Sequence, residues 1–279
     1  MKLVQAAVLG LALGLVFLHL LRPVLDSPYL ERLNYRQRRV PTAGGLVGVV
    51  ATSFGVALWW FLHPYEAPDV LASTLIAVVG FGLLGFVDDV LAAGSDRGFA
   101  GHLRALSHGR LTTGGLKLLG GGVVGALTAL PIDDGLRGRV VADAVLIALA
   151  ANAGNLFDRA PGRTLKVSLL ATVVVLLATT HDLLLAGPII AIAAFAALLR
   201  ADLHESLMLG DTGANAIGGV LGLSLLFTVT FRARMVVLVA LLVLNAASEV
   251  VSFSRVIDRV APLRWVDRAG RPSRYPESP

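Results

Sequence analysis

The sequence predicts an all-α, polytopic membrane protein, and three observations lead to this fold class. Of the 279 residues, 56% are hydrophobic and only 15% are charged, whereas about a quarter of the residues in a soluble domain are charged. The mean hydropathy is +0.76. The apolar residues gather in long runs separated by short polar stretches, which is typical of a helical membrane protein.

Nine apolar runs are long enough to cross a bilayer as helices, which takes about 17–25 residues each. They occupy residues 3–21, 44–62, 70–87, 115–131, 140–157, 165–180, 183–199, 213–230 and 235–253. The first run has no small-x-small cleavage site and leads directly into an Arg-rich segment, so we expect a retained helix rather than a signal peptide. We expect one transmembrane domain over residues 1–254 and a basic cytoplasmic tail over 255–279.

The distribution of basic residues predicts the orientation. One set of segments holds 19 of the 24 Lys and Arg residues, namely 22–43, 88–117, 158–166, 200–212 and the tail from 254. Because Lys and Arg favour cytoplasmic loops, we assign this set to the cytoplasm. Nine spans then place the N-terminus outside and the C-terminus inside a multi-pass protein of the cell membrane. The net charge of +5 therefore indicates orientation rather than nucleic-acid binding.

Carboxylates gather where the predicted helices meet the cytoplasm. Asp88, Asp89, Asp158 and Asp211 each lie at a helix end. Carboxylates in close proximity repel one another unless a cation lies among them. The chain has no cysteine, which excludes a disulfide framework, a thiolate zinc site and a cysteine nucleophile. An oxygen-only ligand set favours a hard cation, Mg²⁺ or Mn²⁺, bound together with substrate phosphates.

Each polar motif also has a structural explanation. Lys117 is typical of an interfacial lysine, and Gly44-Gly45 suits close helix packing. Asn152 and Asn155 share one helix face and suit interhelical hydrogen bonds. What favours a functional site is that all these motifs lie on one side of the membrane, where nearby Arg and Lys side chains suit a phosphorylated substrate.

The order of the motifs resembles that of a known family. The motifs are Pro41-Thr42-Ala43-Gly44-Gly45, Gly85-Phe86-Val87-Asp88-Asp89, Lys117 at a helix start, Asn152-Ala153-Gly154-Asn155-Leu156-Phe157-Asp158 and Gly210-Asp211-Thr212-Gly213. In this order they resemble the polyprenyl-phosphate N-acetylhexosamine-1-phosphate transferases, over about residues 34–253. The resemblance implies Mg²⁺-dependent transfer of a phosphosugar from a UDP-sugar to a polyprenyl phosphate, which releases UMP and supplies cell-envelope glycan precursors. It also implies that both substrates and the membrane are partners; we expect no nucleic acid and leave a homodimer open.

The resemblance also implies roles for single residues. Asp211 would be the principal metal ligand, and Asp88 and Asp89 would match the acidic pair that activates the lipid phosphate or helps to hold the metal. These three are the expected catalytic residues. The expected substrate-binding residues are Lys117, Asn152, Asn155, Asp158, Arg159, Arg163, Arg38 and Arg39.

The sequence departs from the family pattern on the nucleotide side. The family continues Asp-Gly-x-Asp-Gly after the Asn-Leu-x segment, whereas this chain reads Asp158-Arg159-Ala160-Pro161-Gly162-Arg163. Pro161 thus replaces the second aspartate, and the two added arginines are candidates for binding phosphate. Met208 stands where the family has an aromatic residue, and residues 264–271 lack the family's histidines. These changes predict altered nucleotide or sugar selection.

Two functional hypotheses follow. The first is a divergent transferase whose metal and phosphate groups are intact. The second is a non-catalytic relative that binds a polyprenyl phosphate or a partner in envelope assembly. The four retained carboxylates favour the first hypothesis. A transporter fits less well, because its charged or broken helices are expected at the bilayer midplane and these acids lie at helix ends.

The predicted topology can be tested with a reporter. We expect a reporter fused after the last residue to be active only in the cytoplasm, because the tail from residue 254 belongs to the basic, cytoplasmic set of segments. The measurement compares a reporter that is active only in the cytoplasm with one that is active only outside. Activity of the second reporter alone would overturn the orientation.

Overall fold

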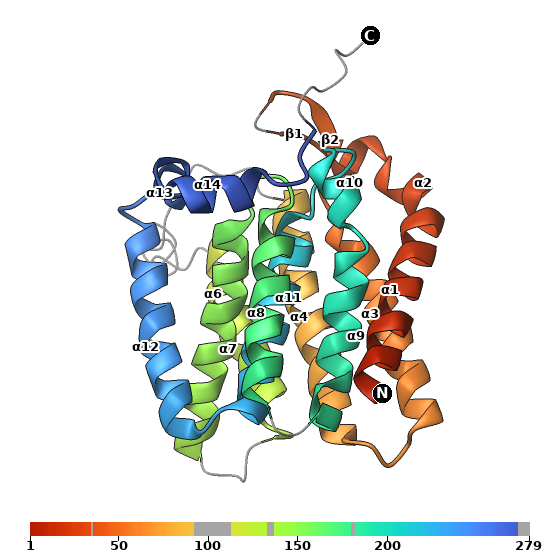
Figure 1. Cartoon of the computed structure of the whole chain (residues 1–279), viewed down its shortest axis with the longest axis vertical. Coiled ribbons are helices and arrows are strands. Elements are labelled where there is room, and N and C mark those ends of the chain that lie inside the picture. The colour runs from red at the N-terminus through yellow and green to blue at the C-terminus, as the bar shows by residue number, and fades with distance from the viewer. Residues whose placement is uncertain (35, 92–112, 133–136, 180–181, 273–279) are drawn as a thin grey trace.

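The structure is a computed structural model, and it describes residues 1–34, 36–91, 113–132, 137–179 and 182–272. Within these ranges long helices run side by side through the molecule (Figure 1). They are α1 (Lys2–Leu20), α3 (Gly45–Leu62), α4 (Pro68–Leu91), α6 (Thr113–Ala129), α7 (Arg137–Phe157), α8 (Arg163–Ala178), α9 (Ala186–Ala196), α11 (Gly210–Thr228) and α12 (Phe231–Ser248). The shorter elements are α2 (Arg22–Leu25), η1 (Pro28–Leu30), β1 (Glu31–Leu33), β2 (Arg39–Pro41), η2 (Asp182–Leu185), α10 (Leu199–Leu203), α13 (Phe253–Arg259) and α14 (Ala261–Arg268).

The helical fold class is confirmed, and each expected span overlaps one of the long helices, although the bounds differ, as for 235–253 against α12. Six helical segments among the described residues are long and apolar enough to cross a membrane, namely Lys2–Leu20, Gly45–Leu62, Pro68–Leu91, Arg137–Phe157, Ala186–Leu203 and Phe231–Ser248. A seventh, in α6, is apolar but shorter. Nine crossings and the orientation therefore stay predictions. Residues 92–112 and 273–279 lie outside the described residues.

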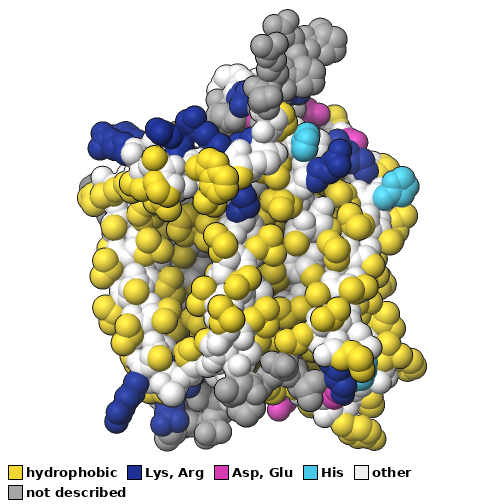
Figure 2. Space-filling view, in the orientation of Figure 1, with side chains coloured by type: hydrophobic (Ala, Val, Ile, Leu, Met, Phe, Trp, Pro, Cys, Tyr) yellow, Lys and Arg dark blue, Asp and Glu magenta, His cyan; other side chains and the backbone are white. Residues whose placement is uncertain are grey.

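The flank of the bundle is apolar. Figure 2 shows hydrophobic side chains over the length of the helices, with Lys and Arg gathered towards the two ends. Many of the largest of these side chains are exposed on the protein surface, for example Phe54 at 59%, Val174 at 66% and Val236 at 70%. A continuous apolar surface of this kind is far larger than the patches of a soluble monomer and fits the hydrocarbon of a bilayer.

α11 is the central helix of the bundle. It packs against α4 and α7 on two sides, and also against α3, α8 and α9. Small residues permit this close approach: a Cβ added at Gly45 would lie 2.1 Å from the backbone nitrogen of Gly213, and one at Gly218 would lie 2.2 Å from the carbonyl oxygen of Ala150. The packing explanation for the glycine pair at the start of α3 therefore holds for Gly45.

A short hairpin at one end of the bundle was not predicted. β1 and β2 pair antiparallel, with Arg32 opposite Val40. Asn34 donates a hydrogen bond of 2.8 Å to the buried carboxylate of Glu205, and Arg36 forms an ion pair of 3.1 Å with the same carboxylate. The hairpin is thus fixed to the loop that leads into α11, which helps to position the first turn of that helix.

An ion pair joins α7 to α12. The carboxylate of Asp143 is fully buried and pairs with the guanidinium of Arg234, whose side chain is 12% exposed. Arg234 also lies over the ring of Phe231, 5.3 Å from its centre. Because a buried charge without its partner is costly, this pair constrains how α12, which has no buried residues of its own, sits against the bundle.

Substitution of one member of this pair should destabilise the fold. We expect Asp143→Leu to lower the free energy of unfolding by roughly 3–5 kcal/mol, because Arg234 then keeps a charge in a buried setting. The double variant Asp143→Leu/Arg234→Leu should recover most of this loss. Thermal unfolding in detergent measures both effects, with Arg22→Ala, which breaks an exposed pair with Asp26, as the control with about 1 kcal/mol or less. Equal stability of the parent and Asp143→Leu would contradict this role.

Candidate active site

The three expected catalytic carboxylates lie together where α4 meets the first turn of α11. Asp88 and Asp89 occupy the last turn of α4, and Asp211 is the second residue of α11. The approach of the two helices depends on Gly85, because a Cβ at this position would lie 2.2 Å from the carbonyl oxygen of Asp211. The Gly-Phe-x-Asp-Asp and Gly-Asp motifs are therefore neighbours in space although more than a hundred residues separate them in sequence.

Asp89 caps the N-terminus of α11. Its carboxylate accepts hydrogen bonds from the backbone N–H of Asp211 at 3.0 Å, from that of Thr212 at 2.9 Å and from the Thr212 hydroxyl at 2.6 Å. Helix N-termini carry unsatisfied N–H groups and a partial positive charge, so a carboxylate stabilises them. Gly210, with φ of +71°, makes room, since a Cβ there would lie 2.7 Å from the Asp89 carboxylate.

Lys117 lies between the other two carboxylates. Its ammonium group donates a hydrogen bond of 2.8 Å to Asp88 and a second hydrogen bond to Asp211. Asn155, from the end of α7, donates a further bond of 3.4 Å to Asp211. Residues of α4, α6 and α7 thus converge on Asp211. The positive charge of Lys117 offsets the negative charges of Asp88 and Asp211.

The donor set at this point fits a hard divalent cation. Asp88 and Asp211 offer carboxylate oxygens, which Mg²⁺ prefers, and the position between them already holds a positive charge, that of Lys117. Asp89 directs both oxygens to α11 instead. Within the described part of the chain, no group of three or more His, Asp or Glu side chains is arranged to hold a metal. Asp88 and Asp211 suffice for such a site, since Mg²⁺ commonly uses one or two protein carboxylates together with phosphates and water.

Asp158 follows α7 and adds another carboxylate to the neighbourhood. It accepts a hydrogen bond of 3.3 Å from the hydroxyl of Thr164. Burial, together with the negative charges of Asp202 and Asp211, raises the pKa of Asp158 well above its usual range. Its neighbour Arg159 is exposed. The end of α7 therefore places a poorly solvated carboxyl group and an accessible guanidinium side by side.

Three other expected binding residues lie outside this cluster. Asn152 donates a hydrogen bond of 2.5 Å to Asn245 of α12, so the interhelical explanation describes its contact. Arg39 is exposed on the hairpin and Arg38 is partly exposed at its turn. A substrate role for these three stays a prediction.

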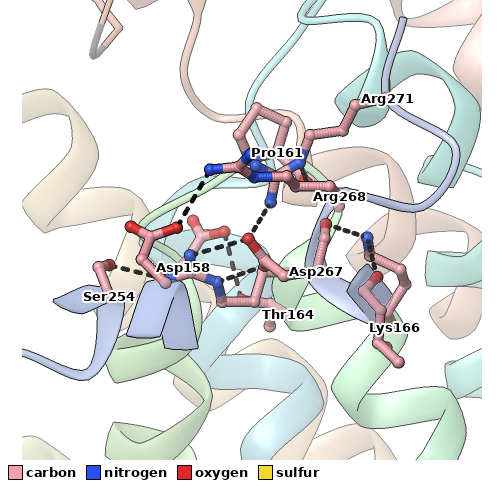
Figure 3. Close-up of polar contacts among 12 residues, drawn as sticks. Asp158, Pro161, Thr164, Lys166, Ser254, Asp267, Arg268 and Arg271 are labelled. Carbon is pink, nitrogen blue, oxygen red and sulfur yellow. Dashed lines mark hydrogen bonds and ion pairs between the residues drawn. The ribbon is translucent and has the colours of Figure 1, made fainter. Parts of the chain in front are cut away.

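Arg163 has its partners inside the protein. It is buried and holds the carboxylate of Asp267 with two hydrogen bonds, of 2.7 and 3.2 Å, and it also donates to the hydroxyl of Ser254 at 2.8 Å. Arg271 adds an ion pair of 2.8 Å with Asp267 and a hydrogen bond of 3.1 Å to the carbonyl of Pro161 (Figure 3). The segment 158–163, which departs from the family pattern and is called the rewritten segment below, thus binds the C-terminal tail through Pro161 and Arg163.

The surroundings of Asp267 favour its charged form. Burial alone would raise the pKa of this carboxyl, but the hydrogen bonds and charge of Arg163, followed by the charges of Arg271 and Lys166, hold the pKa below its usual value. Asp267 is therefore ionised at neutral pH.

An apolar cavity of about 370 Å³ lies between α7, α8, α11 and α12. Its lining is apolar apart from Thr164 and Ser168. Thr164 also contacts Asp158 and the carbonyl of Gly154, at 3.3 and 3.4 Å. One end of the cavity is therefore close to the polar segment, and the rest extends along the helices. Its lining residues include Gly154, Phe157, Val167, Leu221 and Leu241.

Several residues of the site region were not predicted from the sequence. Thr212 shares the cap formed by Asp89, and Asp202 accepts a hydrogen bond of 2.8 Å from the backbone of Gly162. Asp267 pairs with Arg163. For Thr212, the adjacency to Asp211 was a usable signal; for Asp202 and Asp267, no local pattern in the sequence indicates these partners.

Comparison with known proteins gives relatives over most of the chain. No family model matches it. The phospho-N-acetylmuramoyl-pentapeptide-transferase of Rhodopseudomonas palustris strain BisA53 is 30% identical over 269 residues, which covers 81% of this chain and 71% of the relative. The protein of the same name from strain BisB18 is 30% identical over 252 residues, with 77% and 66% covered. The chain therefore belongs to the phospho-N-acetylmuramoyl-pentapeptide-transferase superfamily, as a divergent member.

Proposed function

We propose that the protein transfers a phosphosugar from a UDP-sugar to a polyprenyl phosphate at the cytoplasmic membrane face and releases UMP. The observation that carries this proposal is the group formed by Lys117 with Asp88 and Asp211 at the end of the bundle. Both relatives are named as phosphosugar transferases. A site at the bilayer surface can meet a soluble nucleotide and a membrane lipid at once.

The reaction needs two anions to approach each other. An oxygen of the lipid phosphate forms a new bond to the phosphorus that carries the sugar, and the bond to UMP breaks, so that UMP leaves with the electron pair. Asp88 and Asp211 would hold Mg²⁺, which lowers the repulsion between the substrates and stabilises the charge on the leaving UMP. The protein supplies alignment, which accounts for much of the rate in phosphoryl transfer.

The remaining residues have separable roles in this proposal. Lys117 moves its positive charge from the two carboxylates to a substrate phosphate. Asn155 orients Asp211 through its hydrogen bond. Asp89 positions Asp211 by fixing the first turn of α11. Arg159, which is exposed beside Asp158, is the arginine of the rewritten segment that we assign to the nucleotide sugar.

The apolar cavity is the proposed place for the lipid chain. Its lining by α7, α8, α11 and α12 suits a hydrocarbon, and its polar edge at Thr164 lies next to Asp158. A lipid chain in this cavity would therefore bring a phosphate headgroup towards the carboxylates. Some 370 Å³ holds only part of a polyprenyl chain, so the remainder would extend into the bilayer.

Loss of the metal ligand should abolish turnover. We expect purified protein with Mg²⁺, undecaprenyl phosphate and a panel of UDP-sugars to release UMP. Asp211→Asn should lower this release by at least about 10²-fold, because stabilisation of the transferred phosphoryl group is lost. Asp69→Asn, an exposed aspartate in the first turn of α4, is the matched control and should retain full activity.

The same assay separates the two hypotheses. Full activity of Asp211→Asn would remove this residue as the metal ligand. No UMP from any sugar, with binding of the lipid phosphate intact, would instead favour a non-catalytic relative.

Substitution of Asp88 and substitution of Asp89 should differ in their effects on stability and activity. Asp89→Asn removes a charged acceptor from three donors, so we expect a loss of about 1–3 kcal/mol in the free energy of unfolding as well as reduced activity. Asp88→Asn should reduce UMP release with little change in stability, because its partner Lys117 keeps a second carboxylate, that of Asp211. Thermal unfolding and UMP release, measured on the same preparations, compare the two. An Asp89→Asn variant as stable as the parent would refute the capping role.

A further inference from the structure

The two helices after α12 have no role in the proposed reaction. α13 and α14 lie across one end of the bundle, whereas the long helices run along it (Figure 1). In a membrane-embedded bundle, such helices lie roughly parallel to the membrane surface, at the level where the helix ends leave the hydrocarbon.

α14 is amphipathic. Trp265 is 75% exposed, Leu263 is 48% exposed and Val266 is 40% exposed. At 100° per residue these side chains spread over one half of the helix, whereas Arg264 and Arg268, four residues apart, lie on the opposite side. Figure 2 shows basic side chains at the outer end of the molecule over these two helices, with hydrophobic side chains next to them towards the flank.

α13 repeats this composition. Its exposed apolar residues are Val256 and, at the junction with α14, Val260, each 41% exposed. The two helices together carry four arginines, namely Arg255, Arg259, Arg264 and Arg268. They carry two aspartates, of which Asp267 is paired with Arg163 of the bundle. The surface that remains is therefore clearly positive.

The contacts with the bundle fix how α14 is turned about its axis. Asp267 is held by Arg163, and Lys166 donates a hydrogen bond of 3.0 Å to the carbonyl of Val266 at the end of the helix (Figure 3). Because these contacts engage the side of Asp267 and the carbonyl end, α14 cannot rotate to bury Trp265 against the protein without breaking a buried ion pair.

We propose that α13 and α14 form an in-plane anchor that binds the anionic phospholipids of the bilayer. The apolar side enters the boundary between headgroups and acyl chains, and the arginines contact the headgroup phosphates. Interfacial helices combine these features, with aromatic and aliphatic residues on one side and basic residues on the other. The negative cytoplasmic leaflet attracts basic segments near the membrane. The proposal rests on the fold and not on the proposed reaction.

Quenching of Trp265 fluorescence by brominated lipid tests the anchor. Trp59→Phe and Trp60→Phe leave Trp265 as the only tryptophan of the chain. This protein is placed in nanodiscs of synthetic zwitterionic and anionic lipid in equal parts, with bromine on the chains of only one of the two. We expect quenching from both, and severalfold stronger quenching when the anionic lipid carries the bromine. The preference should shrink in high salt, which screens surface charges.

The variant and its control separate charge from fold. Arg264→Gln/Arg268→Gln should bring the two quenching values to parity. Arg137→Gln/Arg232→Gln removes the same charge at the other end of the bundle and should leave the preference unchanged. Parity in the parent would overturn the lipid preference. An absence of quenching by either lipid would overturn the anchor itself. Synthetic lipids contain no polyprenyl phosphate, so the result is independent of the proposed substrate.

Discussion

The carboxylate of Asp89 joins the end of α4 to the first turn of α11, and the rest of the site depends on this joint. Its three hydrogen bonds to Asp211 and Thr212 fix the position of the first turn of α11, which carries Asp211. Gly85 and Gly210 allow the approach, since a Cβ at either would clash with that backbone or with Asp89 itself. A site that must align two bulky anions needs such rigid support, because small displacements of reacting groups are costly in rate.

Charge balance is the second constraint. Asp88, Asp89 and Asp211 meet at the end of a bundle whose flank is apolar, where an uncompensated carboxylate is expensive. The structure divides them: the N-terminus of α11 satisfies Asp89, and Lys117 satisfies the other two. The side chain of Lys117 is flexible, whereas Asp89 is hydrogen-bonded to the backbone of α11. A cation can therefore take the place of the Lys117 ammonium between Asp88 and Asp211, while that ammonium binds a phosphate.

The sequence predicted the helices well because the bilayer imposes a length and a polarity on each of them, and both can be read locally. That Asp88, Lys117 and Asp211 lie at the same end of the bundle was also predicted, whereas the contacts of Lys117 with both carboxylates were not. Other features depend on single contacts between distant residues: the cap formed by Asp89, the hydrogen bond of Asn152 to Asn245, and the pair of Arg163 with Asp267, 104 residues apart. Hydropathy and motif order do not encode such partners, and the short hairpin at Glu31–Pro41 gave no periodic signal.

The rewritten segment after Asp158 is best understood from the pair of Arg163 with Asp267. In the family pattern this segment presents a second aspartate, whereas this chain has Pro161, whose carbonyl accepts a hydrogen bond from Arg271 of the tail. The segment therefore lacks this acidic group and instead binds α14 through the pair of Arg163 with Asp267. Of its two arginines, only Arg159 is exposed, so the same six residues attach the tail and still present a positive charge beside Asp158. The attachment of the tail and the predicted change in nucleotide selection thus concern the same six residues.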